Sequence, residues 1–416
     1  MSIINKNFEK VFYARLFSNA GDSIYEIALM WYIFQKTHST VWTGYAATAM
    51  LLPDMISFIF GKYIDRFPKK YILIFLELLQ AILNILLIFV ALFFKGNMWP
   101  LLITIFLINL CGTLIYPTQD AMVPEIVEEH QFTKAQSFLS FAYSGTNYLF
   151  NAIAGFLLTI LSFGEILSFN IVTFVVAALL LYQIKINSTS HIDTNIEISD
   201  NSEIQESSGK PLSNIKYMTH SSILPIIIVG FIFNLLFGGL NVYQVVIAQD
   251  LGGVYYYGWL QGLGALGVLI GTTIIVNVVV RILGEGKLLL LGALGLSINF
   301  FILSQIHNSI LFLIIWTIGF IFLGLSQVSI VPILQHEFPN NKLGSLISLF
   351  YSLTAITLPI GSLLFGWLGK SLTANGFLLS AGFISLMGAI PLIFSKRLLH
   401  LNLSLHSNKN RDKTTG

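Results

Sequence analysis

Twelve stretches of mostly apolar residues dominate the sequence, and each is long enough for a membrane-spanning helix, which needs about 20 residues. Of the 416 residues, 55% are apolar and only 10% are Asp, Glu, Lys or Arg. A water-soluble domain carries roughly 25% charged residues, so this chain has too few to cover its surface in water. The sequence therefore predicts an all-α membrane protein with twelve transmembrane helices. The predicted spans are residues 8–34, 41–61, 71–94, 100–123, 135–161, 165–184, 222–248, 257–280, 288–305, 310–333, 344–368 and 377–395.

The basic residues are distributed unevenly between the two sides of these spans. If the N-terminus is cytoplasmic, 18 of the 22 Lys and Arg residues fall on the cytoplasmic side and three fall in outer loops. Cytoplasmic loops carry an excess of Lys and Arg, and a shift of the register by one helix would reverse the bias. Both termini are therefore predicted to be cytoplasmic.

A polar segment divides the spans into two groups of six. Residues 185–220 are rich in Ser and Asn and lack apolar periodicity, so we expect a flexible cytoplasmic linker. The other predicted parts are an N-terminal six-helix bundle (1–184), a C-terminal six-helix bundle (221–400) and a polar cytoplasmic tail (401–416). Two such halves joined by a central loop are typical of transporters that are built from repeats.

Several classes of function are excluded by the composition and the motifs. The net charge of +2 is too small to indicate a nucleic-acid partner, and the single cysteine, Cys111, excludes a disulfide framework. The sequence contains no GxxxxGK[ST] stretch for ATP binding and no G-x-S-x-G motif of a serine hydrolase. Its histidines lie in or beside loops, without the spacing of metal ligands. We therefore expect neither an enzyme nor a bound metal or cofactor.

Ionisable residues inside the first span give the clearest indication of function. Arg15, Asp22 and Glu26 share a stripe about 40° wide, because each residue turns the helix by about 100°. A charged group inside the bilayer costs at least about 2.5 kcal/mol, so this stripe must face the bundle interior or a water-filled cavity. Neighbouring carboxylates in a low dielectric cannot both ionise cheaply, so one should hold a proton near neutral pH. Arg15, about 10 Å from Asp22 along the helix, can bias which carboxylate stays charged.

These charges predict coupling of transport to protons. Asp22 is the expected main proton carrier, and Glu26 is expected to contact a cationic or polar substrate. Asp54 follows Pro53, where a kink could admit water, so it is a further candidate. The alternative for each is a static interaction that fixes helix packing, and for Glu77 in the third span a bond to a neighbouring helix or to the basic loop is favoured.

Aromatic and amide side chains near the polar stripe, or near its counterpart in the seventh span, suggest a binding pocket. Such a pocket, rich in aromatic rings and poor in charge, accepts varied apolar molecules by stacking and shape. The predicted substrate-binding residues are Tyr25, Glu26, Tyr32, Asn147, Asn151, Asn241, Tyr243 and Gln244.

Four local motifs resemble one known superfamily. The loop after the second span resembles the GxLADRxGRK signature of the major facilitator superfamily, and it reads Gly61-Lys-Tyr-Ile-Asp65-Arg66-Phe-Pro-Lys69-Lys70. The segment 121–135 is similar to the one after span four in the macrolide-efflux-type branch, which comprises drug:proton antiporters. Residues 234–241 and 358–361 resemble spans seven and eleven of that branch. The resemblance covers nearly the whole chain and implies two six-helix bundles that alternate access by rocking.

Charges at the cytoplasmic ends of the spans are expected to act in gating. The resemblance implies that the signature loop latches the two halves together on that side, although such charges are also topology signals. The two acids that end the fourth span are interpreted as gating or packing charges. The predicted gating residues are Asp65, Arg66, Lys69, Lys70, Asp120 and Glu125.

These features predict a proton-coupled secondary transporter of the bacterial plasma membrane that exports lipophilic small molecules, such as drugs or antibiotics, and works as a monomer. Its expected partners are a small-molecule substrate, protons and the lipid bilayer. Antiporters of the superfamily usually carry a Gly-Pro pair late in span five, and the matching residues 150–155 have none. This leaves open uptake or facilitated diffusion of a metabolite. A non-transporting membrane sensor or enzyme is the other alternative, but we find neither a soluble sensor domain nor a paired His or Asp set at a surface loop.

Overall fold

The computed structural model describes most of the chain. The ranges it describes are residues 4–57, 67–93, 97–185, 223–339 and 342–401. Within these ranges the protein is helical and has no β-strand. Nearly all of the predicted linker and tail, together with Asp65 and Arg66 of the predicted gate, lie outside the described residues.

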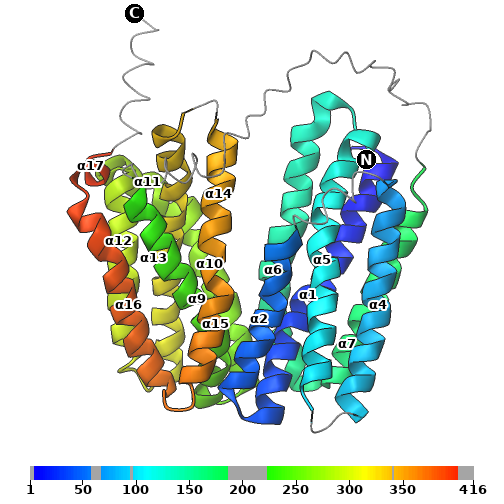
Figure 1. Ribbon diagram of the computed structural model, residues 1–416, viewed down its shortest axis with the longest axis horizontal. Helices are drawn as coiled ribbons and strands as arrows, with labels where there is room; N and C mark the ends of the chain where they lie inside the picture. The colour runs from blue at the N-terminus through cyan, green and yellow to red at the C-terminus, as the bar shows by residue number, and fades with distance from the viewer. Residues whose placement is uncertain (1–3, 58–66, 94–96, 186–222, 340–341, 402–416) are drawn as a thin grey trace, which may run out of the picture. The chain divides into compact units, whose positions relative to one another are not determined.

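Long helices make up the N-terminal half (Figure 1). They are α1 (Lys6–Thr37), α2 (Thr40–Ile56), α4 (Lys69–Phe93), α5 (Trp99–Ile126), α6 (Phe132–Ile160) and α7 (Phe163–Tyr182), with the short 3₁₀ turn η2 (Glu129–Gln131) before α6. Local capping sets some of their ends. The Asn5 side chain accepts a hydrogen bond from the Phe8 N–H at the start of α1, and Ser162 and Glu165 form a capping box at the start of α7.

The C-terminal half has the same helical character but more interruptions. Its elements are α9 (Leu224–Leu251), α10 (Val254–Ile270), the π-helical turn η3 (Gly271–Ile275), α11 (Val276–Leu283), α12 (Glu285–Leu303), α13 (Ser309–Glu337), α14 (Leu343–Ala355), α15 (Thr357–Leu368), α16 (Ala374–Phe394) and α17 (Lys396–Leu399).

Within the described ranges, the residues of the predicted spans are mostly helical. Nine helices in the described ranges are long and apolar enough to cross a membrane. Two predicted spans are interrupted. The span 257–280 contains the π-helical turn. The span 344–368 divides at Ile356, three residues before Pro359, which lies in the first turn of α15.

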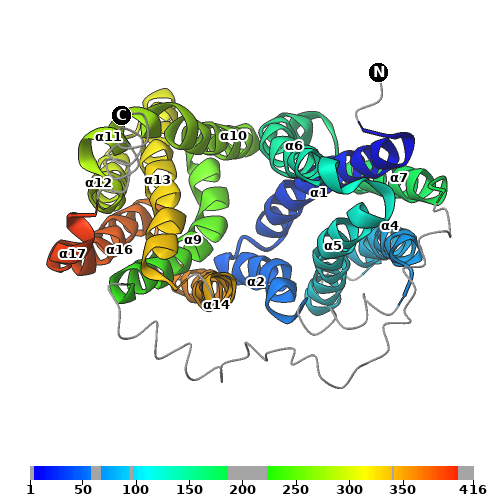
Figure 2. The same ribbon diagram turned by 90° about the horizontal axis from the view of Figure 1, so that it is seen from above.

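The helices group into two compact units. The described residues of the first unit lie within 4–185, 244–262 and 365–370, and the second unit comprises the other described residues. In the first unit, α1 packs against α6 and α7, whereas α4 packs against α5 and α7 (Figure 1 and Figure 2). In the second unit, α12 packs against α13 and α16. The polar residues of α1, α4, α5 and α7 therefore lie within a single unit.

A glycine sets how closely α1 approaches α7. Gly21 of α1 faces Asn170 and Thr173 of α7, and a Cβ atom at this position would overlap Oδ1 of Asn170 and Oγ1 of Thr173. Both α7 side chains are buried, and Thr173 Oγ1 donates to the Asn170 carbonyl at 2.7 Å. Small residues let membrane helices pack at short range, and here the close approach brings amide groups of α7 to the polar stripe of α1.

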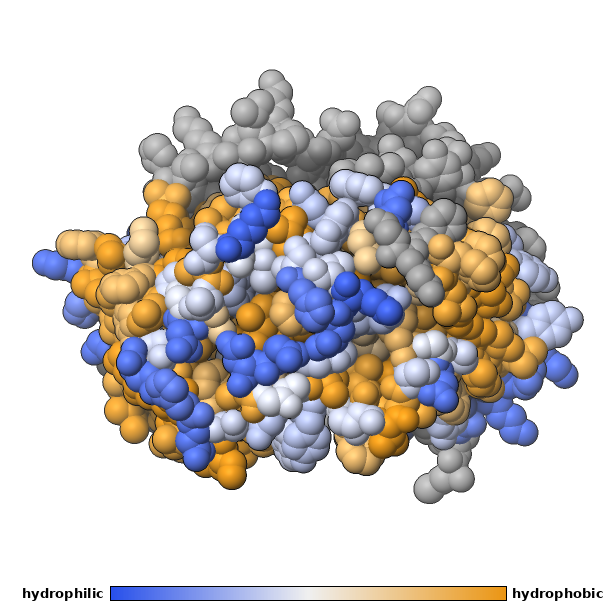
Figure 3. Space-filling model, turned by 90° about the horizontal axis from the view of Figure 1, so that it is seen from below, coloured by the Kyte–Doolittle hydropathy of each residue, from blue (hydrophilic) through white to orange (hydrophobic). Residues whose placement is uncertain are grey.

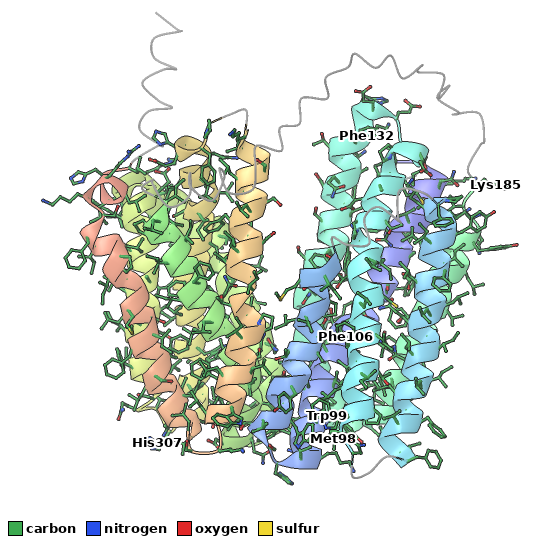
Figure 4. All side chains as sticks on the ribbon, in the orientation of Figure 1. Met98, Trp99, Phe106, Phe132, Lys185 and His307 are labelled. Atoms are coloured by element: carbon green, nitrogen blue, oxygen red, sulfur yellow. The ribbon has the colours of Figure 1, made fainter. Side chains whose placement is uncertain are left out.

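Lysines cap one end of the first unit. Lys10 Nζ donates to the Gln183 carbonyl at 2.6 Å, and Lys70 Nζ donates to the Ile184 carbonyl at 2.7 Å, next to Lys185 (Figure 4). Positive charge at the C-terminus of a helix complements its macrodipole. This is the end that the sequence predicts to be cytoplasmic.

Aromatic rings gather at the opposite end of the same unit. Trp99, at the start of α5, packs against Trp42 and Tyr45 with ring centroids 5.8 and 5.9 Å apart (Figure 4). Trp and Tyr are enriched at membrane–water interfaces. Seen from below, hydrophilic and hydrophobic residues are interspersed on this face (Figure 3).

Candidate functional site

A buried arginine is the centre of the polar network in the first unit. The Arg15 side chain of α1 is 4% exposed, and its hydrogen-bond partners among the described residues belong to α5. Its Nε donates to Gln119 Oε1 at 2.6 Å, and its Nη2 donates to Asp120 Oδ1 at 3.3 Å. The guanidinium also lies over the ring of Tyr116, 5.1 Å from the centroid. A planar guanidinium can make bidentate bonds and stack at the same time, which a lysine cannot.

The network continues from α1 to α5 and α6 through an amide. The Tyr116 hydroxyl donates to Asn19 Oδ1 at 2.5 Å, and Asn19 Nδ2 donates to the Ala142 carbonyl of α6 at 3.1 Å. Each polar atom of the Asn19 side chain is thus used inside the bundle. Hydrogen-bonded networks of this kind fix the relative positions of helices in a low-dielectric interior.

A small recess opens beside this network. Polar side chains of α1 and α5 form most of its wall, and the lining residues are Arg15, Ser18, Asn19, Asp22, Gly112, Ile115, Tyr116 and Gln119. The recess places a buried cation at one point of its wall and the Asp22 carboxyl group at another. The recess is polar, but it has no room for a water molecule.

The acids of α1 lie near other acids. The Asn170 side chain donates a hydrogen bond to Asp22, and Asp22 is close enough to Glu26 and Glu77 for their charges to act on one another. The charge of Asp54 in turn acts on Glu26. Like charges at such range oppose ionisation of the whole set, because each added negative charge raises the cost of the next.

Asp54 has a different environment from the acids of α1. Asp54 is exposed, and its Oδ1 accepts a hydrogen bond from Thr113 Oγ1 of α5 at 2.8 Å. Pro53 precedes it inside α2, which continues to Ile56. Asp54 is therefore an accessible carboxyl group on the α2–α5 side of the unit.

The predicted substrate-binding residues of the first unit have varied surroundings. Tyr25 is 1% exposed, and its hydroxyl has no hydrogen-bond partner among the described residues. The Tyr32 ring stacks on Phe163 with centroids 4.1 Å apart. Asn151 Nδ2 donates to Asn147 Oδ1 at 2.6 Å within α6, and Asn151 Oδ1 has no partner in the described part of the chain. Tyr25 and Asn151 thus keep unused polar atoms.

The predicted substrate-binding residues of α9 are mostly buried. Tyr243 stacks on Phe377 with centroids 4.1 Å apart, and its hydroxyl donates to the Leu372 carbonyl at 3.0 Å. Gln244 is buried with its Oε1 unpaired among the described residues, and Asn241 is half-buried. Tyr243 therefore has a packing role that uses its whole side chain, whereas Gln244 has a free acceptor.

The described gating candidates lie near the end of the first unit that carries the lysines. Lys70 caps α7 and lies 5.5 Å from the centroid of the Tyr182 ring. Asp120 pairs with Arg15, and its side chain is 44% exposed. Glu125 is exposed near the end of α5. Among the described residues, no three His, Cys, Asp or Glu side chains form a group that could hold a metal ion.

Sequence reasoning missed several members of this network. Gln119, Tyr116 and Ser18 were not singled out, although all three line the recess. The sequence pattern relates Arg15 to Asp22, its neighbour along α1, whereas the hydrogen bonds of Arg15 go to α5. Gln119 precedes Asp120 directly, and an amide beside an intramembrane acid is a signal that could have found it.

Replacement of Arg15 by lysine should destabilise the first unit. One ammonium group cannot keep the bonds to both Gln119 and Asp120 and also cover the Tyr116 ring, so we expect a loss of about 1–3 kcal/mol. Thermal unfolding of the purified protein in detergent measures this as a lower Tm. Arg281→Lys, at an exposed site, is the matched control and should leave Tm unchanged. Equal Tm values for both variants would contradict the role of the guanidinium.

Comparisons with known proteins agree on the kind of molecule. The profile of a family described as "Transmembrane secretion effector" matches residues 2–412. Macrolide efflux protein A of Streptococcus pyogenes is 22% identical over 394 residues, which cover 91% of this chain and 94% of that protein. An MFS-type transporter of Bacillus subtilis, YvqJ, is 20% identical over 409 residues, with 95% and 94% covered.

The fold is similar to that of solved transporters. The crystal structure of the nucleoside transporter NupG matches with a TM-score of 0.75 at 9% identity, and covers 95% of this chain and 99% of its own. The D-xylose-proton symporter matches with a TM-score of 0.67 at 17% identity, over 94% and 97% of the two chains. At such identities the likeness concerns the fold alone.

Proposed function

Because this chain belongs to the transmembrane secretion effector family of the major facilitator superfamily of transporters, we propose that it exports lipophilic small molecules in exchange for protons. It is a multi-pass membrane protein, and the proposed location is the bacterial plasma membrane, where it acts as a monomer. Transport proceeds by alternating access, in which the two six-helix halves rock against each other. We propose no catalytic chemistry for the chain.

The row of ionisable groups on α1 is the observation that supports proton coupling. Arg15 and Asp22 line the same recess, and Asp22 acts electrostatically on Glu26. Intramembrane ionisable residues mark ion and proton pathways, because their burial is too costly for packing alone. In this proposal Asp22 binds and releases the transported proton, and Asp54 assists from α2. The positive charge of Arg15 biases which carboxylate stays ionised.

The relative from S. pyogenes supports the substrate class, since its name records macrolide efflux. In the proposal, Glu26 contacts a cationic or polar group of the substrate, and Tyr25, Tyr32, Asn147 and Asn151 contact its apolar and polar parts. Asn241 and Gln244 contribute from α9, where Tyr243 packs against Phe377. The gate consists of the signature loop with Lys69 and Lys70, and of Asp120 and Glu125.

Uptake or facilitated diffusion of a metabolite is the second candidate. One observation favours it: α6 runs from Phe132 to Ile160 as a single helix, and residues 150–155 contain no Gly-Pro pair. A Gly-Pro pair would break the helical hydrogen bonds and bend the helix at that point. Exchange-driven export in the superfamily is associated with such a kink.

An accumulation assay in bacteria that lack their own drug pumps tests both candidates. Cells that express the protein are loaded with radiolabelled erythromycin or with ethidium, with and without a protonophore. Proton-driven export lowers the cell content of a probe, and the protonophore restores it. A rise in content supports uptake instead. Equal content in expressing and control cells for both probes would refute export of these compounds.

A further inference from the structure

Two lysines from different helices converge on the end of α7. Lys10 of α1 donates from Nζ to the Gln183 carbonyl at 2.6 Å, and Lys70 of α4 donates from Nζ to the Ile184 carbonyl at 2.7 Å. Both lysines are half-buried. Consecutive Cα atoms are about 3.8 Å apart, so two ammonium groups on consecutive carbonyls are held within one small region.

A third lysine belongs to the same region. The Lys185 N–H donates to Asn7 Oδ1 at 3.2 Å, and Asn7 Nδ2 donates to the Lys185 carbonyl at 2.7 Å. This reciprocal pair holds the Lys185 backbone beside the first turn of α1, and the residue itself is exposed (Figure 4). The starts of α1 and α4 and the end of α7 therefore bring three positive side chains to one place (Figure 2).

Negative charge at this place is too small to balance the lysines. The C-terminus of α7 carries roughly half an elementary negative charge, and the N-termini of α1 and α4 carry positive charge of similar size. Among the described residues, neither Lys10 nor Lys70 forms an ion pair with an acid. Glu9 precedes Lys10, but each residue turns the helix by about 100°, so the two side chains leave α1 in different directions. An ammonium group has three donors, which leaves both lysines able to bind a further acceptor.

Two exposed tyrosines flank this cluster. Lys70 Nζ lies 5.5 Å from the centroid of the Tyr182 ring of α7 and 6.0 Å from that of the Tyr71 ring of α4. Both tyrosines are exposed. Tyrosine is enriched at membrane–water interfaces, because its ring is apolar and its hydroxyl is polar. The cluster therefore suits the level of the lipid headgroups.

Apolar side chains continue both tyrosine faces along the helices. Phe75 follows Tyr71 by four residues on α4, and Leu179 precedes Tyr182 by three residues on α7, so each lies on the same helix face as its tyrosine. Phe75 and Leu179 are both exposed. This flank of the first unit thus combines positive charge at one end with an apolar surface for acyl chains beside it.

We propose that this cluster binds the headgroup of one anionic phospholipid. Its members are Lys10, Lys70, Lys185, Tyr71 and Tyr182. The phosphate oxygens accept hydrogen bonds from the lysine ammonium groups, the tyrosine hydroxyls donate to phosphate or ester oxygens, and the acyl chains lie along α4 and α7. Basic clusters between membrane helices at the cytoplasmic side bind anionic headgroups. The site does not depend on the proposed export.

Native mass spectrometry of the delipidated protein in detergent tests the site with two probes, phosphatidylglycerol and phosphatidylcholine. We expect wild-type protein to retain one phosphatidylglycerol with an affinity about tenfold or more above that for phosphatidylcholine. Lys10→Gln with Lys70→Gln should remove this preference, and Lys10→Arg with Lys70→Arg should keep it. Lys134→Gln with Lys287→Gln is the matched control, because it removes two exposed lysines that the sequence also places on the cytoplasmic side. The control should bind as wild type.

A second variant tests the site without touching the lysines that cap α7. Tyr71→Leu with Tyr182→Leu leaves the charge of the protein unchanged, so attraction by charge alone predicts no effect. We expect the affinity for phosphatidylglycerol to fall by about threefold or more, because the hydroxyl donors are lost. This variant also decides the matter should the lysine-to-glutamine variant fail to fold.

Three outcomes would overturn the proposal. Equal affinities of wild-type protein for the two lipids would exclude a headgroup site for negative charge. An equal loss in the two lysine-to-glutamine variants would mean that overall charge attracts the lipid without a defined site. Displacement of phosphatidylglycerol by an equal concentration of glycerol 1-phosphate would indicate a site for a soluble phosphate, whereas a lipid site is expected to keep its lipid.

Discussion

Replacement of Gly21 by leucine is expected to prevent α1 from packing against α7 and to remove most of the folded protein. A side chain at this position would overlap Asn170 and Thr173, which are buried and hydrogen-bonded to each other. Overpacking of a tight interface costs about 1–3 kcal/mol, and more where polar groups lose their partners. Destabilisation of this size lowers abundance several-fold. The yield of monodisperse protein after detergent extraction, measured by size-exclusion chromatography, gives the result.

Gly164→Leu is the matched control, since a Cβ atom at Gly164 has no neighbour within 4 Å. It should leave the yield unchanged. Gly21→Ala should be intermediate, and shortening both opposing side chains with Asn170→Ala and Thr173→Ala should restore part of its yield. Equal yields for Gly21→Leu and Gly164→Leu would show that α1 and α7 do not need this close approach.

Replacement of Asp22 by asparagine is expected to abolish the coupling of transport to protons. Asparagine keeps the size of the side chain but cannot bind or release a proton, so we expect gradient-driven flux in everted vesicles to fall by about tenfold or more. Exchange without a gradient should persist, and the dependence of the remaining flux on the pH difference should be flat.

Asp250→Asn, at an exposed aspartate near the end of α9, is the matched control for this loss of charge. It should transport as wild type. Full gradient-dependent flux in Asp22→Asn would remove Asp22 from the coupling mechanism. Loss of both exchange and coupled flux would instead indicate that Asp22 binds substrate.

The helices could be predicted from the sequence because the physical signal is local. A run of apolar residues about 20 long determines a spanning helix whatever its neighbours are. The interruptions inside the helices were harder to predict. The π-helical turn at 271–275 begins at a glycine and contains no proline, so the sequence carries no strong signal for it.

The candidate site could be predicted only on the side that α1 contributes. The spacing of Arg15, Asp22 and Glu26 places them on one stripe of a helix, which is a local property. The pairing of Arg15 with Gln119 and Asp120 joins residues more than 100 positions apart, and helical periodicity does not encode which helices meet.

The partners of Arg15 on α5 have a consequence for movement. Tyr116, Gln119 and Asp120 occupy a single turn of that helix, and the guanidinium contacts all three. One turn of an α-helix is about 5.4 Å long. A displacement of α1 along α5 by part of that length would separate the guanidinium from these partners while the guanidinium is still enclosed. We therefore expect the two helices to hold one axial register, so that the carboxyl groups of α1 stay level with the same turns of α5.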